Sequence, residues 1–423
     1  MGFNWNKDPK RADESRKGDR VILFLDTFGA SGGVGRCTRE LLKAFTQSGT
    51  DVLCCGRSHV VESFKPIIAE DGRIRFHNLD RPLYDPRVLS VRFCSHFFGQ
   101  SATASDALLG AVHAKIGKTD ESHTKSRILV NYPQIIPPPG KDYEFSVLIY
   151  DLNWLRFPGN FREPEKIDRW CREWIERAVS VITISEVTRR EVIDAYGRSP
   201  ASVIAAPLAP FPPHTTVSPI LDKTVLDRLG LKAGRFYLYP AAWGLHKGFT
   251  ALTEALELAK GTDPAVVTCG EPLEKIETAT SEIATLRKSL AGRWKRLVSE
   301  KRLVITSYLP DEDLEVLRRN CKAYILPSEY EGFGFPLVEA IYHYRPALVA
   351  PIPAHVEMLS RYPQYTLARL CELNSGKTFA QNLNDLPTEC ADAPIGWAEG
   401  IEKTWSWSHT AALISSSLSM QQR

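Results

Sequence analysis

The feature that most constrains the fold is an alternation of short apolar runs with longer helical stretches along most of the chain. The first run is Arg20–Asp26 (RVILFLD), and it is followed by a glycine-rich turn, a helical stretch at Gly35–Gln47 and another run at Asp51–Cys55. Continuous apolar runs are typical of strands buried on both faces, and alternation with helices indicates parallel sheets. The sequence therefore predicts an α/β protein.

The same alternation continues to about residue 344. Further strands are predicted at Ile128–Tyr132, Ser146–Tyr150, Val179–Ser185, Ser202–Ala206, Phe236–Tyr239, Ala265–Cys269, Leu303–Thr306 and Ala323–Leu326. Helices are predicted at Glu186–Tyr196, Gly248–Lys260, Glu274–Ser299, Glu312–Asn320 and Pro336–Tyr344. The mixed, polar stretch Leu373–Trp397 has no clear pattern.

An uncharged, proline-rich stretch divides the chain. Ser199–Leu221 is long enough to span a bilayer, but its six prolines each cost a helix about 3 kcal/mol. The stretch is therefore predicted to be a strand that runs into a stiff linker. With 423 residues, we expect two domains, 1–212 and 213–395, with a cleft between them, and a C-terminal helix at 396–423.

Composition excludes several classes of protein. The 53 basic and 50 acidic residues nearly cancel, which argues against a dedicated nucleic-acid binder. Nine cysteines without a CxxC pair favour a reducing compartment, and the polar N-terminus lacks the apolar core of a secretory signal. No HExxH motif or cysteine–histidine cluster at zinc spacing is present. We therefore expect a cytoplasmic protein that needs no metal or other cofactor.

The strongest candidate site is the block PSEYEGFGFPLVEA at residues 327–340, which follows a short strand. Its glycines let the backbone approach a ligand, and Pro336 suits the first turn of a helix. Free amides at a helix start favour an anion such as a diphosphate. Glu331 and Glu339 can accept hydrogen bonds from sugar hydroxyls. The alternative is an ordinary turn followed by a helix glutamate.

This block resembles the Glu, seven residues, Glu pattern of retaining glycosyltransferase family four, and the resemblance extends from about Arg20 to Trp405. It implies the GT-B fold, in which two Rossmann-like domains with parallel sheets face each other across a cleft: an N-terminal acceptor domain and a C-terminal nucleotide-sugar donor domain. It also implies that the C-terminal helix at 396–423 crosses back to the N-terminal domain. Glu331 would then lie at the donor sugar and Glu339 at the nucleotide ribose. The amides beside the donor would be those of Gly332, Phe333, Gly334 and Phe335.

The block YLYPAAWGLHKGF at residues 237–249 places a lysine after a strand. The resemblance implies that Lys247 contacts the donor diphosphate, whereas the alternative is a solvated lysine. Many family members carry an arginine where this chain has Ala241, so His246 is a candidate second cation. The sequence of this block is similar to that of bacterial mannosyltransferase-like members, which favours GDP-mannose or a related sugar nucleotide as the donor.

The exit of the first strand, DTFGASGGVGR, holds Gly32 and Gly33, which resemble the family's glycine loop. The GxxxGxG spacing also fits short-chain dehydrogenases, which bind a nicotinamide dinucleotide at such a turn. Those enzymes need a YxxxK motif, and no tyrosine here is followed by lysine at that spacing. The transferase reading is therefore favoured.

Two acidic residues complete the predicted site. Asp151 follows a strand where many relatives have His-Asp, and this chain has Tyr150 in place of the histidine. Asp151 can orient or deprotonate an acceptor hydroxyl, or it can cap the segment that follows. Glu271, after another strand, can contact the nucleotide, and an ordinary loop glutamate is the alternative.

Two further segments have a simpler explanation. The DxD spelling at Asp311–Asp313 is explained by a helix N-cap with an acidic first turn. Arg87–Phe98 mixes arginines with aromatic residues and is compatible with peripheral membrane contact, although an ordinary packed helix is favoured.

The resemblance implies transfer of a sugar from a nucleotide diphosphate to a glycan or lipid-linked glycan with retention of configuration. It also implies a front-face route in which the departing diphosphate helps to remove the acceptor proton. A nucleotide-sugar epimerase on the same fold and a non-catalytic sugar- or nucleotide-binding relative stay open. The departures at Tyr150 and Ala241 motivate the second of these.

Overall fold

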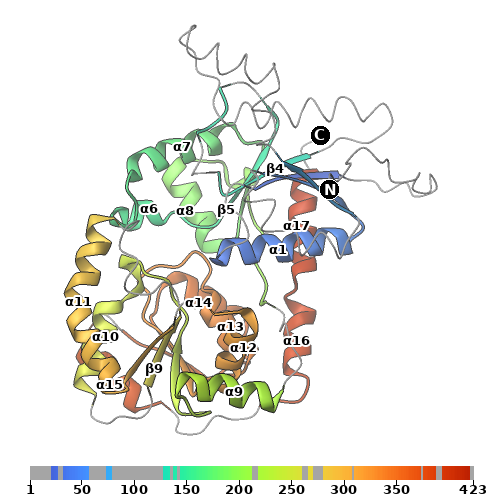
Figure 1. The fold of residues 1–423 in the computed structure, drawn as a ribbon. Helices are drawn as coiled ribbons and strands as arrows, with labels where there is room; N and C mark the ends of the chain where they lie inside the picture. Colours follow the sequence, from blue (N-terminus) through green and yellow to red (C-terminus); the bar gives the residue numbers. More distant parts are fainter. Residues whose placement is uncertain are drawn as a thin grey trace, which may run out of the picture. The chain divides into compact units, whose positions relative to one another are not determined.

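The structure is a computed structural model in which the chain forms two compact units (Figure 1). Unit 1 comprises residues 1–131 and 139–145, and unit 2 comprises residues 132–138 and 146–423. The described residues are 21–26, 32–56, 73–78, 127–133, 137–140, 143–211, 218–259, 265–269, 280–306, 309–372, 375–386 and 393–419. The predicted domain boundary at residue 212 stays a prediction.

Unit 1 contains a parallel sheet with the strand order β3-β2-β1-β4. These strands are β1 (Val21–Asp26), β2 (Asp51–Gly56), β3 (Ile74–Asn78) and β4 (Arg127–Asn131). Phe24 pairs with Cys54 of β2 and with Leu129 of β4. Helix α1 (Gly32–Gln47) connects β1 to β2 and buries Leu41, Leu42 and Phe45. This strand–helix–strand unit confirms the sequence prediction for the first apolar runs.

Unit 2 begins with a parallel ladder of three short strands, β5 (Ser146–Ile149), β6 (Val181–Thr183) and β7 (Val203–Ala205). The side chains of β5 and β6 are buried throughout. The connections hold α6 (Asn153–Arg156), the 3-10 turn η2 (Pro158–Asn160), α7 (Pro164–Arg177), α8 (Glu186–Tyr196) and the 3-10 turn η3 (Pro200–Ser202). Helix α8 has the predicted bounds because Ser185 caps its start and Gly197, at φ +65°, ends it.

The rest of unit 2 is built on a six-stranded parallel sheet with the order β10-β9-β8-β11-β12-β13. Its strands are β8 (Phe236–Tyr239), β9 (Ala265–Cys269), β10 (Leu303–Thr306), β11 (Ala323–Leu326), β12 (Ala347–Val349) and β13 (Ala368–Leu370). Sequence order runs outward from β8 on one side and from β11 on the other. The neighbouring strands β8 and β11 therefore mark the topological switch point, where open α/β sheets bind ligands.

Helices cover both faces of this sheet (Figure 1). On one face lie α10 (Phe249–Leu258), α11 (Ser281–Ser299) and α15 (Gly376–Asn384). On the other lie α9 (Pro219–Leu229), α12 (Asp311–Asn320), α13 (Phe335–Tyr342) and α14 (Pro353–Arg361). Trp294 of α11 is fully buried, and its indole N–H donates to Thr253 of α10 at 2.7 Å. This two-sided cover explains why the strands read as continuous apolar runs.

The C-terminal segment forms two helices, α16 (Trp397–Thr404) and α17 (Trp407–Ser419). Trp405, between them, stacks on Tyr362 at 4.9 Å. Trp407 stacks on Phe211 at 5.7 Å and donates to the carbonyl of Pro210 at 2.8 Å. The predicted C-terminal helix is thus split, and its second half packs on the segment that follows β7.

Some element bounds differ from the predictions. Helix α11 begins at Ser281, later than the predicted Glu274, because Thr280 caps it by accepting from the amide of Ile283. Several elements were not predicted, namely β3, β12, β13, α6, α7, α9, α14 and α15. The unassigned stretch Leu373–Trp397 holds α15 and the first residue of α16.

Candidate active site

The strongest candidate residues meet at the switch point between β8 and β11. Lys247 lies in the 3-10 turn η4 (Leu245–Lys247) after β8, and Glu331 lies in the loop after β11. Lys247 Nζ donates to Glu331 Oε1 at 2.6 Å. The two side chains are 17% and 15% exposed, so the pair is neither fully solvated nor sealed in the core. The structure therefore brings together the lysine and the glutamate that the sequence nominated separately.

The backbones of the two loops hold this pair in place. Gly248, at φ +64°, has no room for a side chain because a Cβ would lie 2.3 Å from the carbonyl oxygen of Pro327. The amide of Glu329 donates to the carbonyl of His246 at 2.8 Å, and the Tyr239 hydroxyl donates to the carbonyl of Lys247. Main-chain contacts thus set the position of the ion pair.

The pKa values of two ionisable side chains at the pair are shifted far from their ordinary values. Burial opposes ionisation of Glu331, but the neighbouring basic side chains, Lys247 foremost, together offset this and hold the pKa of Glu331 at about 2. Burial, reinforced by the Lys247 charge, lowers the pKa of His246 to about 3. This favours the neutral imidazole in the ligand-free protein, and a role of His246 as a second cation toward a bound diphosphate stays a prediction.

The glycines before α13 bring backbone against backbone. A Cβ on Gly332 would lie 2.2 Å from the carbonyl oxygen of Tyr150, and Gly334 has a φ of +88°. Leu337 and Val338 both donate their amides to the Gly334 carbonyl, and Pro336 has no amide proton. Among the described residues, none accepts from the amides of Gly334 or Phe335. These two donors therefore remain for an anion at the start of α13.

Asp151 lies beside this glycine loop, since a Cβ on Gly332 would also come within 2.9 Å of the Asp151 Cβ. Its Oδ1 accepts from the amide of Asn153 at 2.9 Å, so it bonds the segment that follows, but the N-cap of α6 is Leu152 and not Asp151. Burial raises the pKa of Asp151 to about 6, although the Asn153 amide and Lys247 oppose that rise. A carboxyl group poised near neutral pH can accept a proton during a reaction.

Glu339 has a different environment. Its Oε1 accepts from Arg318 Nη2 at 2.7 Å, and the two side chains are only 7% and 4% exposed. Arg318 also lies 3.6 Å from Glu315. The structure thus places Glu339 in a buried ionic cluster of α12 and α13, and its contact with a ribose stays a prediction.

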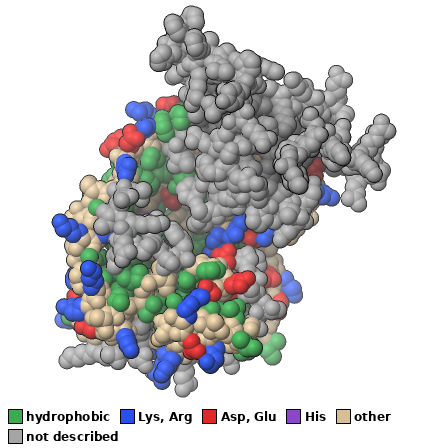
Figure 2. Space-filling view, viewed as in Figure 1, with side chains coloured by type: hydrophobic (Ala, Val, Ile, Leu, Met, Phe, Trp, Pro, Cys, Tyr) green, Lys and Arg blue, Asp and Glu red, His purple; other side chains and the backbone are tan. Residues whose placement is uncertain are grey.

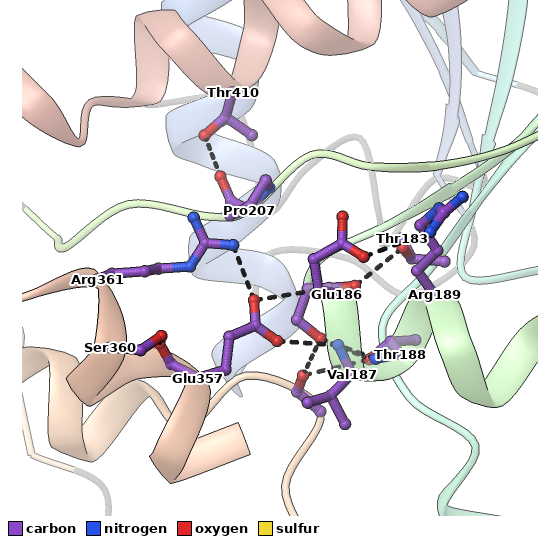
Figure 3. A network of polar contacts seen from close by, with 12 residues as sticks. Thr183, Glu186, Val187, Thr188, Arg189, Pro207, Glu357, Ser360, Arg361 and Thr410 are labelled. Atoms are coloured by element: carbon purple, nitrogen blue, oxygen red, sulfur yellow. Dashed lines mark hydrogen bonds and ion pairs between the residues drawn. The ribbon is translucent and has the colours of Figure 1, made fainter. Parts of the chain in front are cut away.

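Figure 3 shows a network at the start of α8 that the sequence did not indicate as part of a site. Ser185, the residue that caps α8, donates to the carbonyl of Gly332 at 2.6 Å. Glu357 of α14 accepts from the amides of Glu186 and Val187 at 3.1 and 2.8 Å, and Arg361 bonds the same carboxylate at 2.8 Å. The first turn of α8 is thereby tied to the glycine loop and to α14.

Tyr330 was also missed. Its hydroxyl donates to Glu191 at 2.7 Å and accepts from the amide of Leu152 at 2.9 Å. Burial raises the pKa of Glu191, although the hydrogen bond from Tyr330 opposes the rise. Because Tyr330 adjoins Glu331 and Leu152 adjoins Asp151, this hydroxyl links the two acidic loops. No sequence motif marks it, since its partners are distant in the chain.

Gly32, Gly33 and Glu271 were also predicted to belong to the site. Gly32 and Gly33 form the start of α1 in unit 1, where no described atom comes within 4 Å of a Cβ on Gly33. Glu271 and the segment Arg87–Phe98 lie outside the described residues. The acidic first turn of α12 is confirmed, but its N-cap is Pro310, so the prediction that an aspartate caps this helix is wrong.

Neither a metal-ligand cluster nor a membrane-spanning helix is present in the described ranges. No three His, Cys, Asp or Glu side chains there are grouped as metal ligands would be. None of the described helices is long and apolar enough to cross a membrane. On the face shown in Figure 2, basic and acidic side chains are interspersed on the described surface, in agreement with the formal net charge of +3.

The Lys247–Glu331 pair lies within a part of the chain that matches a known protein family. Residues 228–386 match the family model described as "Glycosyl transferases group 1". The O-antigen chain mannosyltransferase B of Escherichia coli is 25% identical over 175 residues, which cover 41% of this chain and 44% of that protein. The mannosylfructose-phosphate synthase of Agrobacterium fabrum is 27% identical over 138 residues, 31% of this chain and 29% of that protein. The chain thus spans less than half the length of these curated relatives.

Solved structures resemble nearly the whole chain. Anabaena Alr3699/HepE, crystallised with UDP and glucose, has a TM-score of 0.67 at 17% identity and covers 95% of this chain and 100% of its own. WaaG, a glycosyltransferase involved in lipopolysaccharide biosynthesis, has a TM-score of 0.58 at 12% identity, with 95% and 99% coverage. These likenesses show a GT-B fold, as predicted, and the region from Lys247 to Glu339 lies within the part that matches the glycosyltransferase family.

Proposed function

We propose that the protein is a glycosyltransferase that moves a sugar from a nucleotide diphosphate to a hydroxyl of an acceptor, with retention of configuration and without a metal. The observation that carries the proposal is the Lys247–Glu331 pair at the switch point, beside the open amides of α13 and inside the region that matches the family model. A cation and helix amides at one place suit a diphosphate.

Lys247 and the start of α13 would stabilise the negative charge that grows on the departing diphosphate. In the free protein Lys247 is bonded to Glu331, so an incoming diphosphate would become its second anionic partner. The Glu331 carboxylate would then accept hydrogen bonds from the donor sugar. Such charge stabilisation in a partly buried site contributes more than it would in water.

Asp151 would orient the acceptor hydroxyl or receive its proton. Its position beside Gly332 and its raised pKa support this role. We expect the departing diphosphate to share in removal of this proton, on the same face of the sugar. Tyr150 adjoins this aspartate and can only donate or accept hydrogen bonds there, since its phenol ordinarily titrates near pH 10.

The mannosyltransferase names of the relatives favour GDP-mannose or a related GDP-sugar as donor. One HepE crystal structure is a complex with UDP-glucose, so UDP-sugars belong in the same assay. The O-antigen relative favours a glycan or a lipid-linked glycan as acceptor. We propose a cytoplasmic location, with peripheral contact at the inner face of a membrane if the acceptor is lipid-linked.

The test is a transfer assay with GDP-, UDP- and dTDP-sugars, a panel of glycan acceptors, and NMR assignment of the new anomeric bond. We expect retention, activity in the presence of EDTA, and a loss of about 10²- to 10³-fold in kcat/KM for Glu331→Gln and Lys247→Ala. Lys223→Ala is the matched control because Lys223 is an exposed lysine paired with Asp227 on α9.

Several results would contradict the proposal. Full activity of both site variants would refute the site, and an inverted product would refute the stereochemistry. Conversion of the donor without an acceptor would indicate an epimerase. Binding of a sugar nucleotide without any turnover across the panel would indicate a non-catalytic binding protein.

A further inference from the structure

Asn160, at the end of η2, contacts the turn that carries Lys247. Its Oδ1 accepts from the amide of Leu245 at 2.7 Å. Its Nδ2 lies 3.1 Å from Asn153 Oδ1 and 2.9 Å from His246 Nδ1. One side-chain amide thus connects the segment after β5 with the turn after β8.

These contacts fix the orientation of the amide. A backbone N–H can only donate, so the atom that faces Leu245 must be the carbonyl oxygen of Asn160. The NH₂ group then faces His246, and its two protons are directed to Asn153 and to the imidazole. Because Asn160 donates to Nδ1, that nitrogen must carry a lone pair. The single proton of the neutral ring therefore lies on Nε2.

The surroundings of the ring stabilise the same state. Burial and the adjacent Lys247 charge both disfavour protonation, and Glu331, from the loop after β11, opposes them only in part. The rings of Phe157 and Tyr330 lie 5.7 and 6.5 Å away. Protonation of His246 Nδ1 would in addition place its N–H directly opposite the N–H of the Asn160 side chain, and the two donors would repel each other.

The proton on Nε2 is available to a ligand. Among the described residues, none accepts a hydrogen bond from His246 Nε2. The ring adjoins Lys247 in the chain and is close enough to Glu331 for the two charges to act on it. A neutral N–H in this place can donate to a phosphate oxygen or to a sugar hydroxyl, both of which are acceptors.

We propose that His246 binds the sugar nucleotide as a neutral donor through Nε2–H, and that Asn160 is the positioning residue that fixes this tautomer. The ligand part of this proposal rests on the proposed function. The assignment gives this chain a neutral hydrogen-bond donor beside Lys247.

The tautomer is tested without any ligand or activity. Long-range ¹H–¹⁵N spectra of the full chain, with His246 assigned by its absence in His246→Gln, should show Nε2–H and no titration between pH 5.5 and 8. In Asn160→Asp, a carboxylate faces Nδ1, and the ring should become protonated and titrate within this range. A wild-type ring that carries its proton on Nδ1, or that titrates near pH 6.5, would overturn the proposal.

The ligand contact is tested by donor affinity. We expect His246→Phe to raise KM for the accepted sugar nucleotide about 10-fold or more, and His246→Gln, which keeps an N–H donor, to restore it to within about 3-fold. His409→Phe, at an exposed position of α17, is the matched control. An unchanged KM in a folded His246→Phe would refute the contact.

The two proposals fail in different ways. If the wild-type protein binds and transfers no sugar nucleotide, the proposed function fails and the ligand contact fails with it, while the spectra still decide the tautomer. If the wild-type protein is active but His246→Phe matches it, only the contact proposed here fails.

Discussion

Glu331 and Glu339 begin from the same sequence motif, yet the structure gives them different partners and different access to solvent. Glu331 pairs with Lys247 where two loops meet, and both side chains keep some exposure. Glu339 pairs with Arg318 inside the packing of α12 and α13, where almost nothing is exposed. One motif therefore holds one partly exposed carboxylate and one buried carboxylate.

The difference teaches how a site can be built from paired charges. A buried pair is expensive to break because the partner left behind keeps its desolvation penalty. A partly exposed pair can exchange partners, since solvent and ligand compensate for the change. The two cations differ in the same way as the two pairs. The buried cation, Arg318, has a planar and permanently charged guanidinium that faces two carboxylates. The partly exposed cation, Lys247, has a compact ammonium on a flexible side chain.

The largest expected effect concerns the buried pair. Arg318→Met should lower the free energy of unfolding by about 3–5 kcal/mol, because Glu339 and Glu315 would remain buried without this cation. Urea unfolding followed by circular dichroism measures the loss. The double variant Arg318→Met/Glu339→Leu should lose less than Arg318→Met alone. A loss below about 1 kcal/mol in the single variant would remove the contrast between the two pairs.

A smaller loss is expected at the exposed pair. Lys247→Met should cost about 1–2 kcal/mol at pH 7, because Glu331 loses its cation but keeps partial access to water. The pKa of Glu331 lies near 2 in the folded protein and near 4.5 when unfolded, so its stabilisation is present above pH 4.5 and is lost as the pH falls toward 2. The difference between variant and wild type should therefore shrink below pH 4.5, as followed by thermal melts. A difference that grows on acidification would contradict the assigned ion pair.

The smallest effect is expected at Asp151, which has no direct cationic partner among the described contacts. Its folded pKa of about 6 exceeds the ordinary value of 3.8, so the stability that its protonated form contributes is present below pH 3.8 and is lost as the pH rises through 6. Asp151→Asn keeps an oxygen for the Asn153 amide. It should be more stable than the wild type by on the order of 1 kcal/mol at pH 8, with no advantage at pH 4. Equal melting curves at pH 8 would refute the raised pKa.

The sequence predicted the elements whose pattern is long or strongly apolar. Strands β8, β9, β10 and β11 have the predicted bounds, because strands covered on both faces must be apolar throughout. The edge strand β13 was not predicted, since its residues are largely exposed and carry little pattern. The short β12 was missed although it is buried.

The candidate site was predictable only in part. Lys247 and Glu331 follow strand ends and belong to recognisable blocks, so they could be nominated from the sequence. Their direct bond could not, because it depends on which strands are neighbours in the sheet. Arg318 sits in a helix with no motif, and its burial against Glu339 follows from how α12 packs on the sheet. The charge of His246 likewise depended on burial that no local pattern reports.

Helices α8 and α13 both begin at the glycine loop, but their first amides have different hydrogen-bond partners. The positive end of α8 is already neutralised by the Glu357 carboxylate, whereas that of α13 keeps the amides of Gly334 and Phe335. An incoming anion therefore finds one of these two poles screened and the other unscreened. Because the Glu357 carboxylate already occupies the amides at the start of α8, we expect an anionic ligand to bind at the start of α13 and not at α8.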